Sequence, residues 1–220
     1  MLGSMPIVEL SHVIHPGMVT YPGLPGPEIT PHLTFEASKE VYAPGTTFEI
    51  NRISLVANTG TYLDSPAHRY PGGADLSQLP LDRLADLPGL VVRATGPAVP
   101  ASAFPPDVRG CAVLVHTGWD RHFGTPAYGS VEHPYLTADA VEWLVANGAV
   151  LVGIDSVNID DTRGGERPAH SGLLAAGIPV VEHLTGLDRL PDKGFRFHAA
   201  PPRFAGMGTF PVRAYAVVDR

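Results

Sequence analysis

The residues best suited to chemistry lie in one short stretch, NTGTYLDSPAH, which covers residues 58–68. Asp64 and His68 stand four positions apart, and Pro66 between them stiffens the turn and removes one backbone donor. A carboxylate and an imidazole on one rigid loop suit metal binding combined with general acid–base catalysis. The pattern alone is weak, because aspartates also cap turns and an isolated histidine is usually structural.

Two further polar residues interrupt apolar stretches later in the chain. His170 opens a short predicted helix, and Glu182 stands in the run GIPVVEHL, residues 177–184. A carboxylate among valines and leucines is costly to bury unless it is paired or bound to a metal. Strand alternation puts Glu182 on one face and His183 on the other, which assigns His183 to the surface or to a supporting position behind the site. A glutamate on the exposed face of an edge strand is the alternative.

The composition is that of a folded protein with an apolar core. The 220 residues are 44% apolar and 17% charged, which fits one domain over residues 1–220. The net charge of −7 argues against nucleic acid and anionic membranes as partners. One cysteine, Cys111, and the lack of a secretory or membrane-spanning pattern predict a cytoplasmic location. The residues GSM at 3–5 fit a cloning scar, so that residues 1–5 would be partly foreign.

The elements that must position these residues are mostly strands. Apolar or alternating runs predict strands over residues 7–14, 46–58, 90–95, 111–120, 149–155, 178–184 and 210–218. A helix with Thr137 as its N-cap ends at Gly148, and a shorter helix from His170 ends at Gly177. Residues 76–89 predict a short helix or helical turns, and the Pro- and Gly-rich residues 15–32 predict a loop. We expect a single α/β domain with a mixed, curled β-sheet flanked by helices.

In this order the motifs resemble those of the metal-dependent cyclase family, which includes bacterial kynurenine formamidases and isatin hydrolases. The mark of that family is His-x-Gly-Thr-His-x-Asp-x-Pro-x-His, and the corresponding stretch here is NTGTYLDSPAH. The segments GIDSVNID, HSGLL and GIPVVEHL follow in the family's order. The resemblance implies a barrel-like swivelling β/β/α fold. It also implies a homodimer or homotetramer in which residues of a neighbour reach the pocket.

The resemblance also implies roles for individual residues. Two metal positions are common in the family, and they share an aspartate and a glutamate, here Asp64 and Glu182. His170 corresponds to the histidine that completes the second position. His68 corresponds to the family's proton donor and acceptor.

The first metal position departs from the family pattern, because Asn58 and Tyr62 replace its two histidines. An amide carbonyl is a weak ligand for zinc or manganese, and a tyrosine hydroxyl with a pKa of about 10 seldom ligates unless it is deprotonated. We expect that position to have lost most of its affinity. Asp64, His170 and Glu182 then remain to hold one divalent ion, Zn or Mn, or none.

Three functions are compatible with these residues. The first is a hydrolase of small cyclic or linear amides, lactams, lactones or esters, with one divalent metal at most and His68 as general acid–base. The second is a metal-free lyase, isomerase or cyclase that uses His68, Tyr62 and Asp64. The third is a non-catalytic relative that keeps the pocket. The candidate substrate contacts are Tyr21, Phe35, Asn58 and Trp119, of which the aromatic ones suit the core equally well.

Two features of the surroundings bear on the substrate. Kynurenine formamidase activity itself is not expected, because the family's usual formamidase carries both motif histidines and this chain does not. In addition, no basic residue beside the motif obviously anchors a carboxylate, although Arg69, Arg163 and Arg167 are near in sequence. The polar, Gly-rich residues 160–170 predict a mobile loop over the site or a plain solvated connector.

Overall fold

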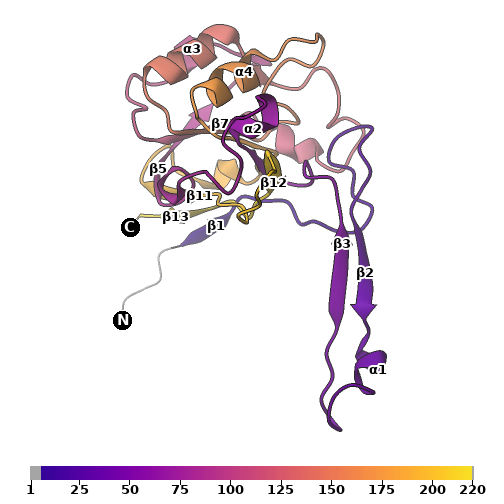
Figure 1. Ribbon diagram of the computed structural model, residues 1–220. Helices are drawn as coiled ribbons and strands as arrows, with labels where there is room; N and C mark the ends of the chain where they lie inside the picture. The colour runs from indigo at the N-terminus through magenta and orange to yellow at the C-terminus, as the bar shows by residue number, and fades with distance from the viewer. Residues whose placement is uncertain (1–5, 220) are drawn as a thin grey trace.

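A nine-stranded sheet forms the frame of the protein in the computed structural model, which describes residues 6–219 (Figure 1). Its strands are β1 Ile7–Glu9, β4 Tyr62–Asp64, β5 Leu87–Arg93, β7 Ala112–His116, β9 Leu151–Ile154, β10 Val180–Glu182, β11 Phe195–His198, β12 Thr209–Pro211 and β13 Tyr215–Val218. They follow the order β1-β13-β11-β5-β7-β9-β10-β4-β12. The expected cloning scar at residues 1–5 lies outside the described residues.

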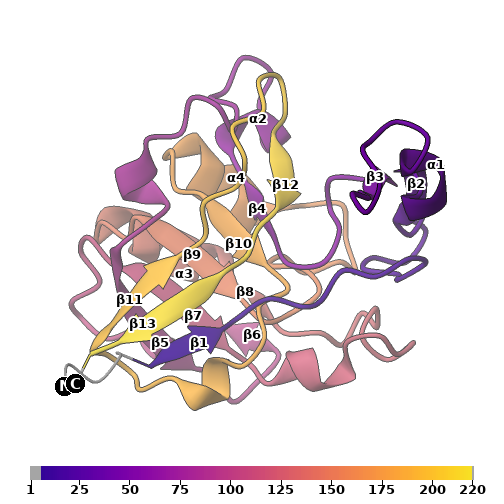
Figure 2. The same cartoon turned by 90° about the horizontal axis from the view of Figure 1, so that it is seen from below.

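The centre of the sheet is parallel and its flanks are antiparallel. Pairs β5–β7, β7–β9 and β9–β10 are parallel, whereas β4, β11, β12 and β13 join antiparallel neighbours. The sheet curls strongly into a half-barrel (Figure 2). This architecture confirms the expected single α/β domain with a mixed, curled sheet.

Two apolar cores lie on the two faces of this sheet. One fills the space between the sheet and helices α3 Ala138–Ala146 and α4 Pro168–Ala175, and the other lies inside the curl. The central strands β7 and β9 are buried on both faces, which explains their continuous apolar sequences. Parallel strands need crossover connections, and the one between β7 and β9 carries α3 across one face of the sheet. Helix α4, between β9 and β10, packs beside α3. The face below α4 is also where the candidate site lies.

The predicted helices of this layer are confirmed, with one difference at the first cap. The Thr137 hydroxyl donates to Asp139 at 2.6 Å and makes no capping bond to the backbone of α3. Both helices stop before a glycine in the left-handed conformation, Gly148 at φ 77° and Gly177 at φ 70°.

Two further expectations concern single segments. Of the short helix or helical turns expected over residues 76–89, the structure has a helical turn, the 3₁₀ turn η1 Leu81–Arg83, because Leu87 already begins β5. The strand expected over residues 210–218 is two strands, β12 and β13. β12 pairs with β4 at one end of the sheet and β13 pairs with β1 and β11 at the other, so this stretch crosses between the two ends of the curl.

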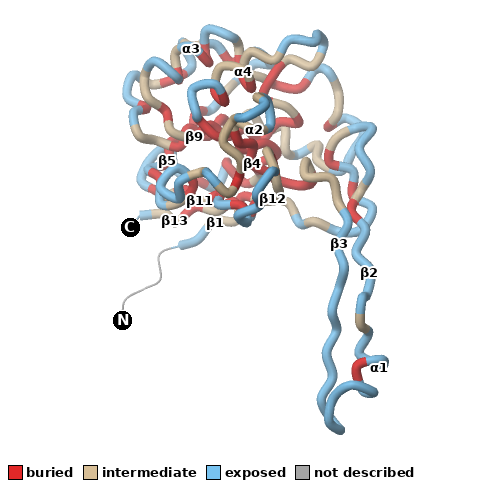
Figure 3. The backbone as a smooth tube through the Cα atoms, viewed as in Figure 1, coloured by how far each residue is buried: buried red, intermediate tan, exposed pale blue. Residues whose placement is uncertain are grey.

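A long hairpin arm projects from the body and takes no part in the main sheet (Figure 1). It contains β2 Glu28–Leu33, the short helix α1 Phe35–Ser38 and β3 Ile50–Ser54. Nearly all of the arm is exposed (Figure 3). Its exposed apolar side chains include Phe35, Val41, Phe48, Ile50 and Ile53. The loop expected over residues 15–32 therefore ends at the start of β2.

The remaining elements are small. β6 Ala98–Val99 pairs with β8 Tyr135–Leu136, and helix α2 Pro66–Arg69 follows β4 directly. Further 3₁₀ turns are η2 Ala101–Ala103, η3 Trp119–His122 and η4 Leu187–Arg189. Within residues 6–219, no helix has the length and apolar character needed to cross a bilayer.

Candidate active site

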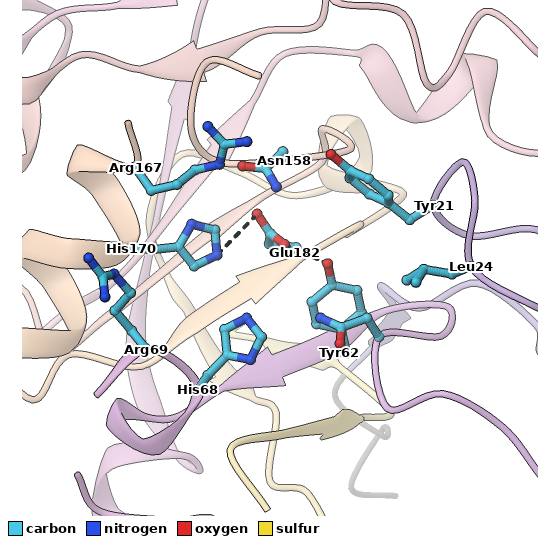
Figure 4. Close-up of a pocket in the computed structure, with 10 residues that line it drawn as sticks. Tyr21, Leu24, Tyr62, His68, Arg69, Asn158, Arg167, His170 and Glu182 are labelled. Atoms are coloured by element: carbon cyan, nitrogen blue, oxygen red, sulfur yellow. Dashed lines mark hydrogen bonds and ion pairs between the residues drawn. The ribbon is translucent and has the colours of Figure 1, made fainter. Parts of the chain in front are cut away.

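The motif residues and Glu182 meet because β4 and β10 are neighbours in the sheet. Their antiparallel register pairs Tyr62 with Glu182 and Asp64 with Val180. Alternation puts the side chains of Tyr62, Asp64 and Glu182 on one face of the sheet. Helix α2 begins just after Asp64 and brings His68 back over it, while α4 brings His170 in from the side (Figure 4). The three predicted metal ligands therefore converge on one face.

Asp64 is the centre of this group and has no hydrogen-bond partner. Its side chain is fully buried, and neither carboxylate oxygen accepts a hydrogen bond from any described residue. His170 Nε2 lies 3.6 Å from Oδ2, and His68 Nδ1 lies 3.7 Å from Oδ1. Ligand atoms of Asp64, His68 and His170 lie within 4.8 Å of one another. One carboxylate and two imidazoles at this spacing fit a divalent cation, which would also compensate the buried charge.

Asp160 holds His170 in this orientation, and sequence reasoning missed it. Its Oδ2 lies 2.6 Å from the ring nitrogen Nδ1 of His170 and also accepts the backbone N–H of His170 at 3.0 Å. Its Oδ1 accepts the backbone N–H of Ala169 at 2.6 Å. Asp160 is fully buried, so residues 160–170 do not form a mobile loop at their start. Metal-binding histidines commonly have such a carboxylate partner. Burial lowers the pKa of His170, but the nearby Glu182, Asp160 and Asp64 raise it by more, so the pKa lies well above its ordinary value.

Glu182 lies beside this group and is already hydrogen-bonded. Its Oε2 accepts the Tyr62 hydroxyl at 2.6 Å, and its Oε1 accepts the Ile159 N–H at 2.6 Å and lies 3.8 Å from His170 Nε2. Burial and the neighbouring Asp64 raise the pKa of Glu182 to about 7, against the opposing effects of His170 and of the two donors. Burial and the two carboxylates raise the pKa of Tyr62 well above 10, so its hydroxyl stays protonated and acts as a donor.

His183 supports Tyr62 from behind the site. It is fully buried, so the alternative of a surface position is wrong and the supporting position is correct. Its backbone takes the left-handed conformation at φ 58° directly after β10, where strand alternation no longer applies. The two ring nitrogens lie 3.2 Å from the Tyr62 hydroxyl and 2.8 Å from the Tyr128 hydroxyl. Burial lowers the pKa of His183 to about 3, so the ring is neutral and one nitrogen donates while the other accepts.

These groups open into a pocket of about 310 Å³ (Figure 4). The lining residues are Tyr21, Leu24, Asn58, Tyr62, His68, Arg69, Asn158, Arg167, His170 and Glu182. Tyr21 and Asn58, two of the candidate substrate contacts, thus line this pocket.

The structure does not bring the other two candidate contacts to this pocket. The Trp119 indole N–H donates to the Tyr128 carbonyl at 2.9 Å, and Phe35 lies on the arm with 54% of its surface exposed. In their place the pocket has Leu24, Asn158 and two arginines. The arginines had a signal in the sequence through their positions near His68 and His170, and Asn158 lies in the segment GIDSVNID, without a role assigned to it.

The chain is similar to known proteins over most of its length. The model of the family described as Putative cyclase matches residues 8–161. A kynurenine formamidase of Maricaulis maris (strain MCS10) is 27% identical over 218 residues, covering 94% of this chain and 95% of that protein. An isatin hydrolase solved with the product analogue thioisatinate has a TM-score of 0.80 at 25% identity, covering 97% of this chain and 92% of the other.

A second solved structure adds the metal to this comparison. It is described as a potential metal-dependent hydrolase with cyclase activity, and it matches with a TM-score of 0.80 and 25% identity over 99% of both chains. Metal dependence is thus part of the description of one solved structure that this chain resembles. Because the family model spans well over half of the residues, the chain belongs to the cyclase family, whose named relatives here are hydrolases.

Proposed function

We propose that the protein is a metal-assisted hydrolase of a small cyclic or linear amide, lactam, lactone or ester. Asp64 is the observation that carries this proposal. A fully buried carboxylate with no donor on either oxygen is strongly unfavourable unless a cation compensates it. His170 Nε2 lies 3.6 Å from Asp64 Oδ2, and imidazole is a preferred ligand of zinc and manganese. His68 Nδ1 lies 3.7 Å from the other oxygen, and we assign it to proton transfer and not to the ligand set. The relatives named kynurenine formamidase and isatin hydrolase support hydrolysis as the reaction.

Asp64, His170 and Glu182 would hold one ion, Zn or Mn. Asp160 accepts a hydrogen bond from His170 Nδ1, which leaves Nε2 as the ligand atom on the side of Asp64 and Glu182. Glu182 keeps unused lone pairs on both oxygens besides those that accept hydrogen bonds. A bound divalent ion polarises the scissile carbonyl and lowers the pKa of the attacking water.

Tyr62 and Asn58 limit the site to a single ion. The Tyr62 hydroxyl donates to Glu182, and its raised pKa keeps it protonated, so it is not available as a ligand. Asn58 lines the same pocket and offers only an amide in place of an imidazole. The two replacements leave the Tyr62 hydroxyl as an orienting donor where the family has a second set of ligands.

His68 is placed to move the proton. It lies at the mouth of the site with 31% of its side chain exposed, and its Nδ1 lies 3.7 Å from Asp64. In a hydrolysis it would take one proton from the attacking water and return it to the leaving nitrogen or oxygen. Contact with solvent lets the imidazole recover its starting protonation state after each turnover.

Metal titration of chelator-treated protein tests these assignments. We expect about one equivalent of Zn or Mn to bind the wild type, and less than about 0.1 equivalent to bind Asp64→Asn or His170→Asn. His68→Gln should keep the metal and lose activity by about 10²- to 10⁴-fold. The half-buried His122, which does not line the pocket, serves as the matched control in the variant His122→Asn. Loss of metal in His68→Gln would make His68 a ligand and refute its proton-transfer role, and a wild type that binds no ion would refute the metal-assisted reaction.

A metal-free lyase, isomerase or cyclase is the second candidate. The observation that favours it is the 2.6 Å hydrogen bond between Tyr62 and Glu182, since burial raises the pKa of Glu182 to about 7. Such a group can donate and accept protons near neutral pH without an ion, with His68 as its partner. Turnover that survives complete removal of metal would favour this reaction over hydrolysis.

We also propose that the protein acts as a homo-oligomer built through the arm. The arm exposes Phe35, Val41, Phe48, Ile50 and Ile53, and a second copy of the chain is the partner that would cover them. Light scattering after gel filtration should give a dimer or tetramer. A monomer at micromolar concentration would exclude this assembly.

A further inference from the structure

We propose that Arg69 and Arg167 form an anion clamp at the mouth of the pocket, and that the substrate carries a carboxylate. The inference builds on the proposed hydrolase function and adds the substrate's chemical class to it. Both arginines line the pocket, one from α2 and one from the residue before α4, and they flank His170 (Figure 4). Neither belongs to the predicted metal or proton-transfer groups.

The backbone holds Arg167 in a fixed orientation. Its Nη1 donates to three carbonyl oxygens, those of Asp161 at 3.2 Å, Gly164 at 2.9 Å and Glu166 at 2.7 Å. Within residues 6–219, Nε and Nη2 have no hydrogen-bond acceptor. These two groups lie on the same edge of a guanidinium and together match the two oxygens of a carboxylate. Anchoring by Nη1 therefore leaves a preoriented fork for an anion.

Arg69 supplies a second positive charge from the opposite side. Its Nε donates to the Ser171 hydroxyl at 3.3 Å, and its guanidinium lies 5.2 Å from the centre of the Tyr70 ring. Both of its Nη groups lack a partner among the described residues. Ser171 therefore fixes the side chain and leaves the outer donors available.

Neither of these two arginines has an acidic partner, and among the described arginines without one they are the two that line the pocket. Four others form ion pairs with carboxylates, namely Arg93, Arg163, Arg196 and Arg213. Neither Arg69 nor Arg167 lies within 4.0 Å of a carboxylate of the described chain, although Glu166 lines the groove just outside them. Two unneutralised guanidinium groups at a pocket mouth favour an anionic ligand.

The clamp also orients the substrate. Asp64 and Glu182 make the inner end of the site acidic, whereas the mouth is basic. A substrate anion is attracted by the arginines at the mouth, so the uncharged scissile group points inward. The clamp thus reverses the expectation that no basic residue anchors a carboxylate.

Benzoate binding, measured by calorimetry, tests the clamp without turnover. The neutral isostere benzamide is the comparison, and metal-free Asp64→Asn protein excludes binding of benzoate to an ion. We expect benzoate to bind at least about tenfold more tightly than benzamide, and the difference to shrink with added salt. This result is independent of whether the metal-assisted reaction is correct.

Variants of the two arginines locate the anion. Arg69→Gln and Arg167→Gln should each weaken benzoate binding about tenfold or more, and Arg167→Lys should restore it only in part, because lysine lacks the fork. Arg203→Gln, outside the pocket, should bind like the wild type, and circular dichroism checks that each variant folds. Equal binding of benzoate and benzamide, or wild-type benzoate affinity in both glutamine variants, would overturn the proposal.

Discussion

Removing the Tyr62 hydroxyl should destabilise the protein more at high pH than at low pH. Tyr62 is 2% exposed, and its hydroxyl donates to Glu182 at 2.6 Å. A hydrogen bond to a charged group contributes about 1.5–3 kcal/mol, whereas one to a neutral group contributes about 1 kcal/mol. The carboxylate of Glu182 is the charged acceptor only above its pKa of about 7. The effect of Tyr62→Phe should therefore depend on the protonation of Glu182.

The size of the effect follows from the hydrogen bond and from linkage. Burial already raises the pKa of Glu182 above its ordinary value, and the Tyr62 donor lowers it. Losing that donor should raise the pKa further, by roughly 1.5 units if the charged bond contributes about 2 kcal/mol more than the neutral one. We expect Tyr62→Phe to reduce the free energy of unfolding by about 1 kcal/mol at pH 5.5 and by about 3 kcal/mol at pH 9.

Urea unfolding of metal-free protein at the two pH values measures this difference. Tyr128→Phe is the matched control, because Tyr128 is 3% exposed and its hydroxyl bonds the neutral ring of His183. The control should lose about 1–2 kcal/mol at both pH values. An equal loss for Tyr62→Phe at pH 5.5 and pH 9, or a smaller loss at pH 9, would show that the hydroxyl does not stabilise the ionised carboxylate.

Three further outcomes are expected. Burial lowers the pKa of His12 to about 4, so its stabilising contribution is complete above pH 6.5 and is lost as the pH falls towards 4. The free energy of unfolding of the wild type should thus fall between pH 7 and pH 5 by up to about 2 kcal/mol more than that of His12→Phe. Urea unfolding of both proteins at the two pH values measures this difference. A Cβ on Gly208 would clash with the backbone nitrogen of His68, so Gly208→Ala should shift His68 and lower kcat about tenfold or more. Gly96→Ala is the control, because a Cβ at Gly96 would meet no atom of the described residues. Ile53→Lys on the arm should shift the molecular mass in light scattering towards the monomer, and an unchanged mass would exclude Ile53 from the subunit contact.

Local sequence patterns predicted which elements form better than they predicted which elements lie side by side. The buried strands β7 and β9 and the helix α3 were readable because a continuous apolar run and a 3.6-residue period are local features. Residues 76–89 have leucines at intervals that suit a helix, but they form only a 3₁₀ turn, because Leu87 of β5 pairs with Phe197 of β11. Pairing between distant strands has no counterpart in local periodicity.

The same limit applies to the site. Asp64, His170 and Glu182 were found from residue type and motif order, and the register of β4 against β10 explains why they meet. Asp160 was missed because its surroundings are polar and Gly-rich, which is typical of loops, whereas its role comes from the start of α4. The opposite error occurred at Trp119, whose side chain is used for packing against the Tyr128 backbone.

The connection between the arm and the pocket is very short. β3 ends at Ser54, and the motif begins at Asn58, so only residues 55–57 separate them (Figure 1). Whatever holds the arm thereby also restrains the first turn of the motif loop, including Gly60 in its left-handed conformation. With assembly through the arm, dilution would loosen that turn, and specific activity would fall with enzyme concentration. Rate constants taken at nanomolar and at micromolar enzyme would then describe two different states of one catalyst.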